Sequence, residues 1–371
     1  MELHFYENLN LLEWVFLIHS FGLLIFTGII LVNLFYVKSL AEWKHITHQP
    51  FVSVLIPARN EALNIGNVLK RLENQTYAHF EVIILNDHST DETEQVIAPF
   101  LKRNPQWKMY QGKSLPADWR GKSFACYQLG QAAQGEILLF ADADTLPEPE
   151  AIHATVSALE KYDFISVFPE QIVKTWAEKL IVPVMDFFLY SHLLFPLISQ
   201  TKNPAFTAAN GQWMAFRKNA YQKISGYEVA KSAVLDDMTI AKAIKKAGLQ
   251  MNTFSGVNAI SCRMYQNPQQ VIEGFSKNSF AAANYQYIGF SLFLLQFLFW
   301  FVFPFFVPVS VFGVSIFWIL FLKFLIARKF QHPVWETVLL HPVAMLFAFG
   351  ICINSMYWHW AGKGHWKGRK L

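Results

Sequence analysis

The stretch FVSVLIPARNE at residues 51–61 passes from an apolar run rich in β-branched residues into a polar cluster. The same change recurs in FEVIILND at residues 80–87 and in ILLFADAD at residues 137–144. Short apolar runs bounded by polar residues are typical of strands buried inside a parallel sheet. The segments between and after these runs have helical patterns, near residues 61–74, 90–103 and 121–133. We therefore expect an α/β domain of βαβ units, whose ligands bind at the carboxyl ends of the strands.

The composition narrows the class of protein. Of the 371 residues, 53% are hydrophobic and only 16% are charged, whereas soluble domains carry about 25% charged residues. An ordinary soluble enzyme and a disordered chain are therefore not expected. The net charge of +4 is too small for a dedicated nucleic-acid binder. Cys126, Cys262 and Cys352 are widely spaced, which argues against a disulfide framework or a zinc module.

The uncharged apolar stretches lie at the two ends of the chain. Trp14–Val37 contains no Asp, Glu, Lys or Arg and exceeds the roughly 20 residues that a helix needs to cross a bilayer. Asn278–Leu322 is also free of these residues and is long enough to cross twice. Pro304, Pro308 and Gly313 are the expected places for its reversal, since proline and glycine break helices.

Thr337–Gly362 is the last apolar stretch. The chain has four crossings if this stretch spans the membrane, and three if it is re-entrant or lies in the interface. Basic residues such as Lys38 and Arg328 follow the apolar stretches, so the positive-inside rule predicts a multi-pass protein of the cytoplasmic membrane with its middle domain in the cytoplasm. The expected organisation is an N-terminal anchor over 1–45, a catalytic domain over 46–266, an interfacial amphipathic segment over 267–289, and a hairpin, final apolar segment and basic tail over 290–371.

Polar residues follow the first two expected strands at the same edge of the sheet. Pro57, Arg59, Asn60 and Glu61 come after the first strand, and Asp87 comes after the second. The simplest role for Asn60 is to cap the following helix. Capping alone does not explain why carboxylates follow both strands at the same edge of the sheet. A ligand-binding site at this edge is the alternative.

The third strand ends in the DxD pair Asp142 and Asp144. Two carboxylates at a buried strand end can hold Mg²⁺ or Mn²⁺ and the diphosphate bound to it. Lys122 lies at an expected helix start, where free N–H groups and a cation suit phosphate oxygens. A solvated basic turn is the alternative for Lys122.

Two further segments could carry the reaction. Asp236 and Asp237 begin a helical run that ends near Gly248. They are either a helix cap and a favourable first-turn charge, or one of them is a general base for an acceptor hydroxyl. An earlier segment combines a glycine with an aromatic wall and is expected on the acceptor side; it consists of Asn210, Gly211, Gln212 and Trp213.

The order of five segments, SVLIPARNE, NDHSTDET, FADADT, NGQWMAFRK and LDDMTIA, resembles the inverting family 2 glycosyltransferases, which have the GT-A fold, a Rossmann-like mixed sheet. The resemblance covers about Phe51–Tyr265. It implies that Glu61 and Asp87 contact the nucleoside of the donor, and that Asp142 and Asp144 hold the metal and the sugar diphosphate. It also implies that Asp237 is the base, with Asp236 as the alternative.

The segments CRMY at 262–265, EGFSK at 273–277 and WKGR at 366–369 resemble the membrane-bound carotenoid glycosyltransferases of the diaponeurosporenoate type. The Gln-x-x-Arg-Trp motif of processive polysaccharide synthases is lacking, and only Arg263 stands near its place. By the resemblance Arg263 lies near the donor diphosphate; a charge at the membrane surface is the alternative.

We expect a glycosyltransferase that moves a sugar from a nucleotide-diphosphate donor, UDP-linked, to a lipid such as a carotenoid, another isoprenoid or a glycerolipid, with inversion. A polyprenyl-phosphate glycosyltransferase is one alternative. A non-catalytic binding or transport protein on the same scaffold is another, although Asn278–Leu322 lacks the ionisable residues that translocation paths usually expose.

Overall fold

The structure is a computed structural model that describes residues 10–366 and 369–370. It divides into two compact units. The first, here the sheet unit, consists of residues 36–172 and 195–264, and the second, here the helical unit, contains the described residues of 1–35, 173–194 and 265–371. Lys367 and Gly368 of the terminal WKGR segment lie outside the described residues.

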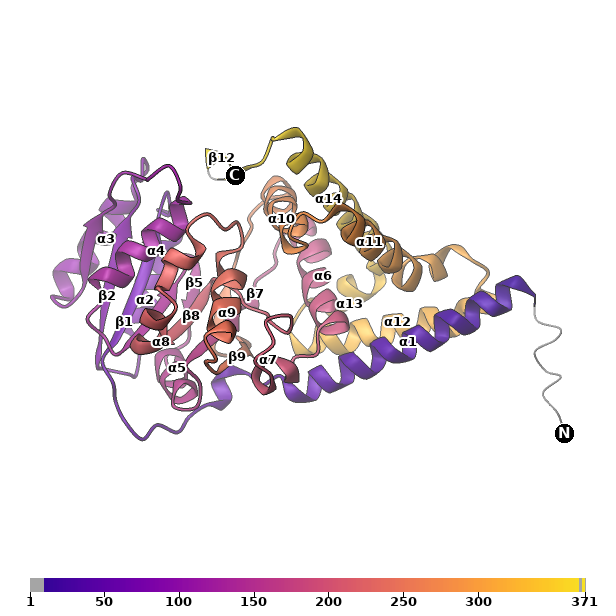
Figure 1. The fold of residues 1–371 in the computed structure, drawn as a ribbon, viewed down its shortest axis with the longest axis horizontal. Coiled ribbons are helices and arrows are strands. Elements are labelled where there is room, and N and C mark those ends of the chain that lie inside the picture. The colour runs from indigo at the N-terminus through magenta and orange to yellow at the C-terminus, as the bar shows by residue number, and fades with distance from the viewer. Residues whose placement is uncertain (1–9, 367–368, 371) are drawn as a thin grey trace. The chain divides into compact units, whose positions relative to one another are not determined.

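The sheet unit is built on a seven-stranded sheet with the order β3-β2-β1-β4-β8-β6-β9 (Figure 1). Its strands are β1 (Val52–Ala58), β2 (Phe80–Asn86), β3 (Lys108–Gln111), β4 (Ile137–Ala141), β6 (Phe164–Phe168), β8 (Trp213–Arg217) and β9 (Met251–Ser255). All neighbouring strands are parallel except that β8 runs antiparallel to both β4 and β6. The expected α/β fold with parallel βαβ units is confirmed, and the sheet is mixed because of β8.

A second, three-stranded sheet lies at the end of β4. Its order is β5-β10-β7, from β5 (Thr145–Pro147), β7 (Glu170–Gln171) and β10 (Ile260–Cys262). The helices of the sheet unit are η1 (Leu40–Glu42), α2 (Ile65–Glu73), α3 (Thr93–Arg103), α4 (Gly121–Ala132), α5 (Ala151–Leu159), α7 (Pro196–Gln200), α8 (Lys218–Lys223), η2 (Gly226–Ala230) and α9 (Asp236–Lys246).

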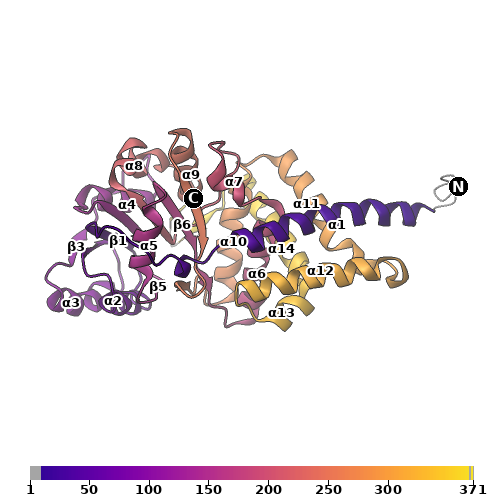
Figure 2. The ribbon, with the colours of Figure 1, turned by 90° about the horizontal axis from the view of Figure 1, so that it is seen from below.

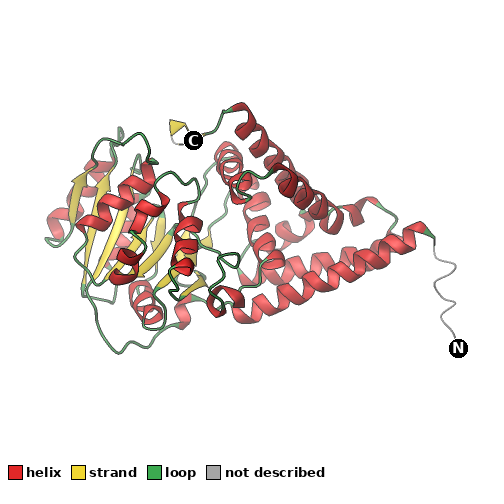
Figure 3. Ribbon diagram, viewed as in Figure 1, coloured by secondary structure: helices red, strands yellow, loops and turns green. Residues whose placement is uncertain are grey.

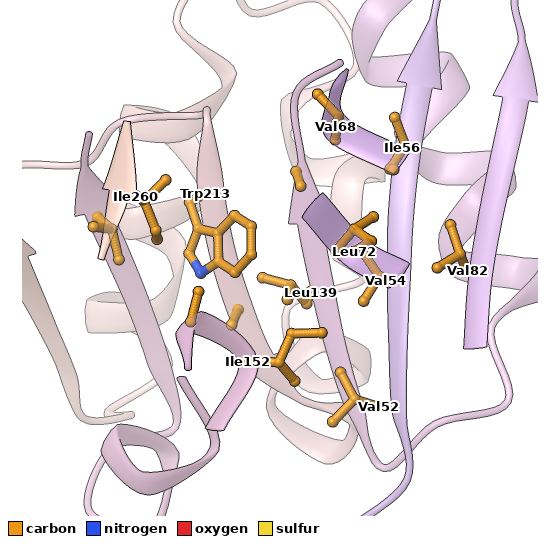
Figure 4. Close-up of a cluster of buried hydrophobic side chains, with 14 of the residues drawn as sticks. Val52, Val54, Ile56, Val68, Leu72, Val82, Leu139, Ile152, Trp213 and Ile260 are labelled. Carbon is orange, nitrogen blue, oxygen red and sulfur yellow. The ribbon is translucent and has the colours of Figure 1, made fainter. Parts of the chain in front are cut away.

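The core of the sheet unit explains why the first three strands are almost wholly apolar. Val52, Val54 and Ile56 of β1 are fully buried and pack with residues of α2 and α5, among them Leu72 and Ile152 (Figure 4). Helix α4 packs on β1 and β2, whose other side chains are also buried. Both faces of these strands are therefore buried, so polar side chains can reach solvent only where the strands end.

The helical unit contains the apolar ends of the chain (Figures 2 and 3). Its elements are α1 (Leu11–Tyr36), α6 (Trp176–His192), α10 (Pro268–Ala282), α11 (Tyr287–Phe301), η3 (Phe303–Phe306), α12 (Val309–Lys329), α13 (Val334–Leu339), α14 (His341–Ala361), β11 (His365–Trp366) and β12 (Arg369–Lys370). Among the described residues, α1 and α12 are long and apolar enough to cross a membrane. The chain reverses between α11 and α12 through Pro304 and Pro308, whereas Gly313 lies inside α12.

Helix α6 belongs to the helical unit although its sequence interrupts the sheet unit. The carboxylate of Asp186 lies 2.7 Å from Nε2 of His332, and both side chains are buried. Nζ of Lys323 donates to the carbonyl of Pro183 over 3.2 Å. These polar contacts join α6 to α12 and to the residues that follow it.

Candidate active site

The carboxyl ends of β2, β1 and β4 lie side by side at one edge of the sheet. The register pairs Ala58 with Asn86 and Leu55 with Phe140, so the three strands end almost level. The polar residues that follow the three strands therefore share this edge, as the sequence predicts.

The loops after β1 and β2 are joined by hydrogen bonds. N–H of Asp87 donates to the carbonyl of Ala58 over 2.8 Å, and Nη1 of Arg59 donates to the carbonyl of Asp87 over 2.8 Å. The same Nη1 lies 4.0 Å from Oδ2 of Asp87. Arg59 thus contributes a half-buried positive charge beside this carboxylate.

Asn60 does not cap the helix that follows it, which corrects the simplest expectation. It has a positive φ of 54°, and its Oδ1 accepts a hydrogen bond from N–H of Thr90. Helix α2 begins five residues later, at Ile65, and its N-cap is Asn64. Asn60 instead ties the loop after β1 to the loop after β2.

Glu61 and Pro57 lie at the same edge. Glu61 is buried, its N–H donates to Oγ1 of Thr93, and its Oε2 accepts a hydrogen bond from Nδ2 of Asn64. Pro57 is the half-buried residue of β1. Glu61, one of the expected donor-side residues, is therefore held by hydrogen bonds to residues at the starts of α2 and α3.

Lys122 and Asp142 form an ion pair at the centre of the edge. Nζ of Lys122, on the first turn of α4, lies 2.6 Å from Oδ1 and 2.8 Å from Oδ2 of Asp142. Loss of solvent opposes the charged amine, but Asp142 and Asp236 raise the pKa of Lys122 above its usual value. Lys122, although exposed, is thus paired with Asp142, the first carboxylate of the DxD pair.

Asp237 faces the same group from α9. Its Oδ2 accepts a hydrogen bond from N–H of Gly211 over 3.0 Å, and its Oδ1 accepts one from N–H of Met238 over 2.7 Å. A Cβ added to Gly211 would lie 3.4 Å from Nζ of Lys122 and 3.7 Å from Oδ2 of Asp237. The glycine therefore lies between the lysine and the carboxylate.

The two carboxylates of α9 differ in their surroundings. Burial, followed by the charge of Asp236, raises the pKa of Asp237 to about 7. Oδ2 of Asp236 is buried and has no hydrogen-bond partner among the described residues. Leu235 occupies the N-cap position and makes no side-chain cap, so Asp236 is a first-turn residue and not the cap.

Asp144 lies where the small sheet begins. In the antiparallel pairing of β10 with β5, Cys262 is opposite Thr145, and Arg263 and Asp144 are the residues that adjoin this last pair in the sequence. Burial, together with the carboxylates of Asp144 and Asp142, raises the pKa of the Cys262 thiol. No cluster of three or more His, Cys, Asp or Glu side chains suited to a metal occurs in the part of the chain that the structure describes.

The expected acceptor-side residues do not all face the site. N–H of Asp142 donates to the carbonyl of Gln212, and Asn210 is held through its backbone by Oγ of Ser166. Trp213, in contrast, is fully buried in the core (Figure 4), and its Nε1 donates to Oγ1 of Thr155. The aromatic wall expected at Trp213 is therefore core packing, because β8 is buried on both faces.

Sequence reasoning missed two contacts of the site. Nε2 of Gln212 donates to Sγ of Cys262, and the carbonyl of Gln212 accepts from N–H of Asp142. Both contacts depend on β4, β8 and β10 meeting across long separations in sequence. The polar dipeptide Asn210-Gly211 before β8 was the local sequence pattern that pointed to this part of the site.

The seven-stranded mixed sheet with acidic residues at its carboxyl edge has the GT-A fold. The mannosyltransferase PcManGT from Pyrobaculum calidifontis, solved in complex with GDP-Man and Mn²⁺, has this fold and is similar to the chain with a TM-score of 0.55 and 17% identity, over 95% of this chain and 100% of that one. Residues 53–225 match the family described as Glycosyl transferase family 2. The chain therefore carries a family 2 domain and is a glycosyltransferase.

Curated relatives agree with this family. The chain is 27% identical to the 4,4'-diaponeurosporenoate glycosyltransferase of Staphylococcus haemolyticus over 269 residues, which is 70% of this chain and 69% of the relative. It is 26% identical to the protein of the same name from Staphylococcus aureus over 237 residues, which is 61% of this chain and 60% of the relative.

Proposed function

We propose that the protein transfers a sugar from a nucleotide-diphosphate donor, UDP-linked, to a lipid acceptor, with inversion at the anomeric carbon. The observation that carries the proposal is the convergence of Lys122, Asp142, Gly211 and Asp237 at the carboxyl edge of the sheet. This arrangement supplies a cation for the donor phosphates and a carboxylate for the acceptor.

The donor nucleoside is assigned to the joined loops after β1 and β2. Glu61 and Asp87 offer carboxylate oxygens to the hydroxyls and N–H groups of a nucleoside, and Arg59 stands beside Asp87. Lys122 contacts Asp142, and Arg263 directly follows the pairing of Cys262 with Thr145, so we assign both charges to the donor diphosphate.

Asp142 and Asp144 fit a divalent metal. Mg²⁺ is commonly bound through one or two carboxylates together with phosphates of the substrate and water, so a pair of hard oxygen donors next to the diphosphate is sufficient. When bound, Mg²⁺ or Mn²⁺ would neutralise the charge of the leaving diphosphate. Lys122 would then share Asp142 with the metal.

Asp237 is assigned as the general base for a hydroxyl acceptor. Its raised pKa of about 7 places the carboxyl near the pH at which a base both ionises and accepts a proton effectively. An acceptor that is already ionised, such as a carboxylate, needs no base, and Asp237 would then hold Gly211 in place.

The helical unit supports a lipid acceptor and a membrane location. Helices α1 and α12 expose large apolar side chains along much of their length, including Leu11, Phe21 and Leu24 on α1 and Val314 and Phe317 on α12. Such surfaces are stable in contact with acyl chains. The names of the staphylococcal relatives point to an apolar carotenoid acid as one acceptor to test.

The proposal is tested by donor turnover in detergent-purified protein. UDP, GDP and dTDP sugars are offered with Mn²⁺ or Mg²⁺ and a carotenoid acid or a lipid alcohol. We expect metal-dependent turnover of a UDP sugar that Asp144→Ala abolishes. Glu92→Ala, which removes an exposed carboxylate that makes no capping bond, is expected to keep full activity. Turnover that survives Asp144→Ala, or no turnover with any donor, contradicts the proposal.

A further inference from the structure

Lys245 is a buried cation on the last turn of α9, the helix whose first turn carries Asp236 and Asp237. The residue is only 2% exposed, and burial lowers the pKa of its amine to about 8. No carboxylate is among its partners in the described ranges 10–366 and 369–370. A buried charge without a counter-ion costs free energy, so its hydrogen bonds must offset that cost.

Three backbone carbonyls surround the amine. Nζ of Lys245 lies 2.6 Å from the carbonyl oxygen of Phe206, 3.1 Å from that of Leu197 and 3.5 Å from that of Asn203. A lysine ammonium carries three donors on a single atom, so it can satisfy three carbonyls that converge on one point. The planar fork of an arginine cannot do so.

Leu197 is the second residue of α7, and Asn203 and Phe206 lie in the first half of the coil that connects α7 to β8, residues 201–212. The middle of the coil is held by Thr253 of β9, whose Oγ1 donates to the carbonyl of Ala208 over 2.6 Å. The far end is held by Asp237, whose Oδ2 accepts from N–H of Gly211 over 3.0 Å. Helix α9 thus contacts both halves of the coil, through Asp237 on its first turn and Lys245 on its last.

We infer that Lys245 is a positioning residue that sets the place of Gly211 between Asp237 and Lys122. It touches neither proposed substrate and acts through the coil. Without it, the hydrogen bond of Gly211 to Asp237 is what joins the coil to α9 in the described part of the chain, and the backbone opposite the proposed base loses support. The expected consequence is weaker placement of the acceptor, with the donor loops after β1 and β2 unchanged.

Hydrogen exchange in the detergent-purified full chain tests the structural step without any substrate. Lys245→Met keeps the length of the side chain and removes its donors. Lys246→Met, at the exposed neighbouring lysine, is the matched control. We expect amides of residues 201–212 to exchange on the order of tenfold faster in Lys245→Met only, with residues 80–87 unchanged. Equal protection in the two variants overturns the inference.

Kinetics test the functional step, which rests on the proposed transferase reaction. Lys245→Met is expected to raise KM for the acceptor about tenfold while donor hydrolysis without acceptor stays within about twofold, because a small misplacement weakens one substrate selectively. An equal fall in hydrolysis and transfer overturns the positioning role.

A variant that does not fold and a wild-type protein without transfer activity can each be distinguished from a failure of the inference. If Lys245→Met does not fold, Lys245→Gln retains two donors on its amide and is expected to show intermediate exchange in residues 201–212; exchange equal to wild type overturns the inference. A wild-type protein without transfer contradicts the proposed function, and the exchange experiment still decides the role of Lys245.

Discussion

Asp237 differs from the other carboxylates of the site in that both of its oxygens accept backbone N–H groups while the side chain is partly withdrawn from water. Asp142 is instead paired with Lys122. The same residue type at one sheet edge therefore meets two environments: Asp142 is paired with a cation, whereas burial and the charge of Asp236 raise the pKa of Asp237 against the opposing effect of its two N–H donors. This difference is the physical reason for assigning one to phosphate and metal and the other to proton transfer.

Asp237→Asn separates the classes of acceptor. With a hydroxyl acceptor, we expect kcat to fall by about 10²–10⁴, the usual contribution of a general base. With a carboxylate or phosphate acceptor, most of the activity should remain. Steady-state transfer with both kinds of acceptor checks this, and Asp236→Asn is the neighbouring control. A larger loss in Asp236→Asn than in Asp237→Asn would reverse the assignment of the base.

The pKa of Asp237 also predicts opposite pH trends for activity and stability. The pKa is raised from 3.8 to about 7, so the folded state keeps a proton that the unfolded state loses, and this group lowers the free energy of unfolding as the pH rises from about 4 to about 7. Over the same range kcat/KM for a hydroxyl acceptor should rise. Thermal unfolding and pH–rate profiles of wild type and Asp237→Asn measure both trends; identical profiles would disprove the pKa assignment.

At the scale of elements, the sequence predicts the strands that are defined by a local apolar pattern. It does not predict contacts between strands that lie far apart in the sequence. The first three buried strands, β1, β2 and β4, begin within one residue of the apolar runs that start at positions 51, 80 and 137, because each run is largely apolar and ends at a polar cluster. Strand β8 was interpreted as an amphipathic wall, although Trp213 and its neighbours are buried on both faces. The pairing of Cys262 with Thr145 leaves no local pattern, so the surroundings of Asp144 could not be predicted.

Two glycine-to-alanine substitutions, at Gly135 and Gly211, test how closely the backbone packs around each position. A Cβ on Gly135, in the loop between α4 and β4, would lie 2.5 Å from N of Ser53 and 2.7 Å from the carbonyl oxygen of Phe51, both backbone atoms. Gly135→Ala should therefore cost about 1–3 kcal/mol of the free energy of unfolding. Gly211→Ala, whose nearest contact is 3.4 Å, should keep the stability. Denaturant unfolding of the two variants compares them, and equal midpoints would refute the expectation.

At the scale of the whole molecule, the apolar surfaces of α1 and α12 predict that the protein behaves as an integral membrane protein. We expect the full chain to stay in the membrane pellet after alkaline carbonate washing, which releases proteins held by charge alone. Fractionation followed by immunoblotting checks this. Release of the chain into the supernatant would contradict a spanning topology and favour binding at the surface.

The interruption of the sheet unit by residues 173–194 determines how the protein can be made and divided. Strand β8, which joins β4 to β6 in the middle of the sheet, is synthesised only after α6, so the sheet cannot close until the ribosome has released a helix of the other unit. Trimming the ends of the gene cannot yield the sheet unit alone. A soluble catalytic fragment requires an internal excision, with a flexible linker from Ile172 to Phe195 in place of α6.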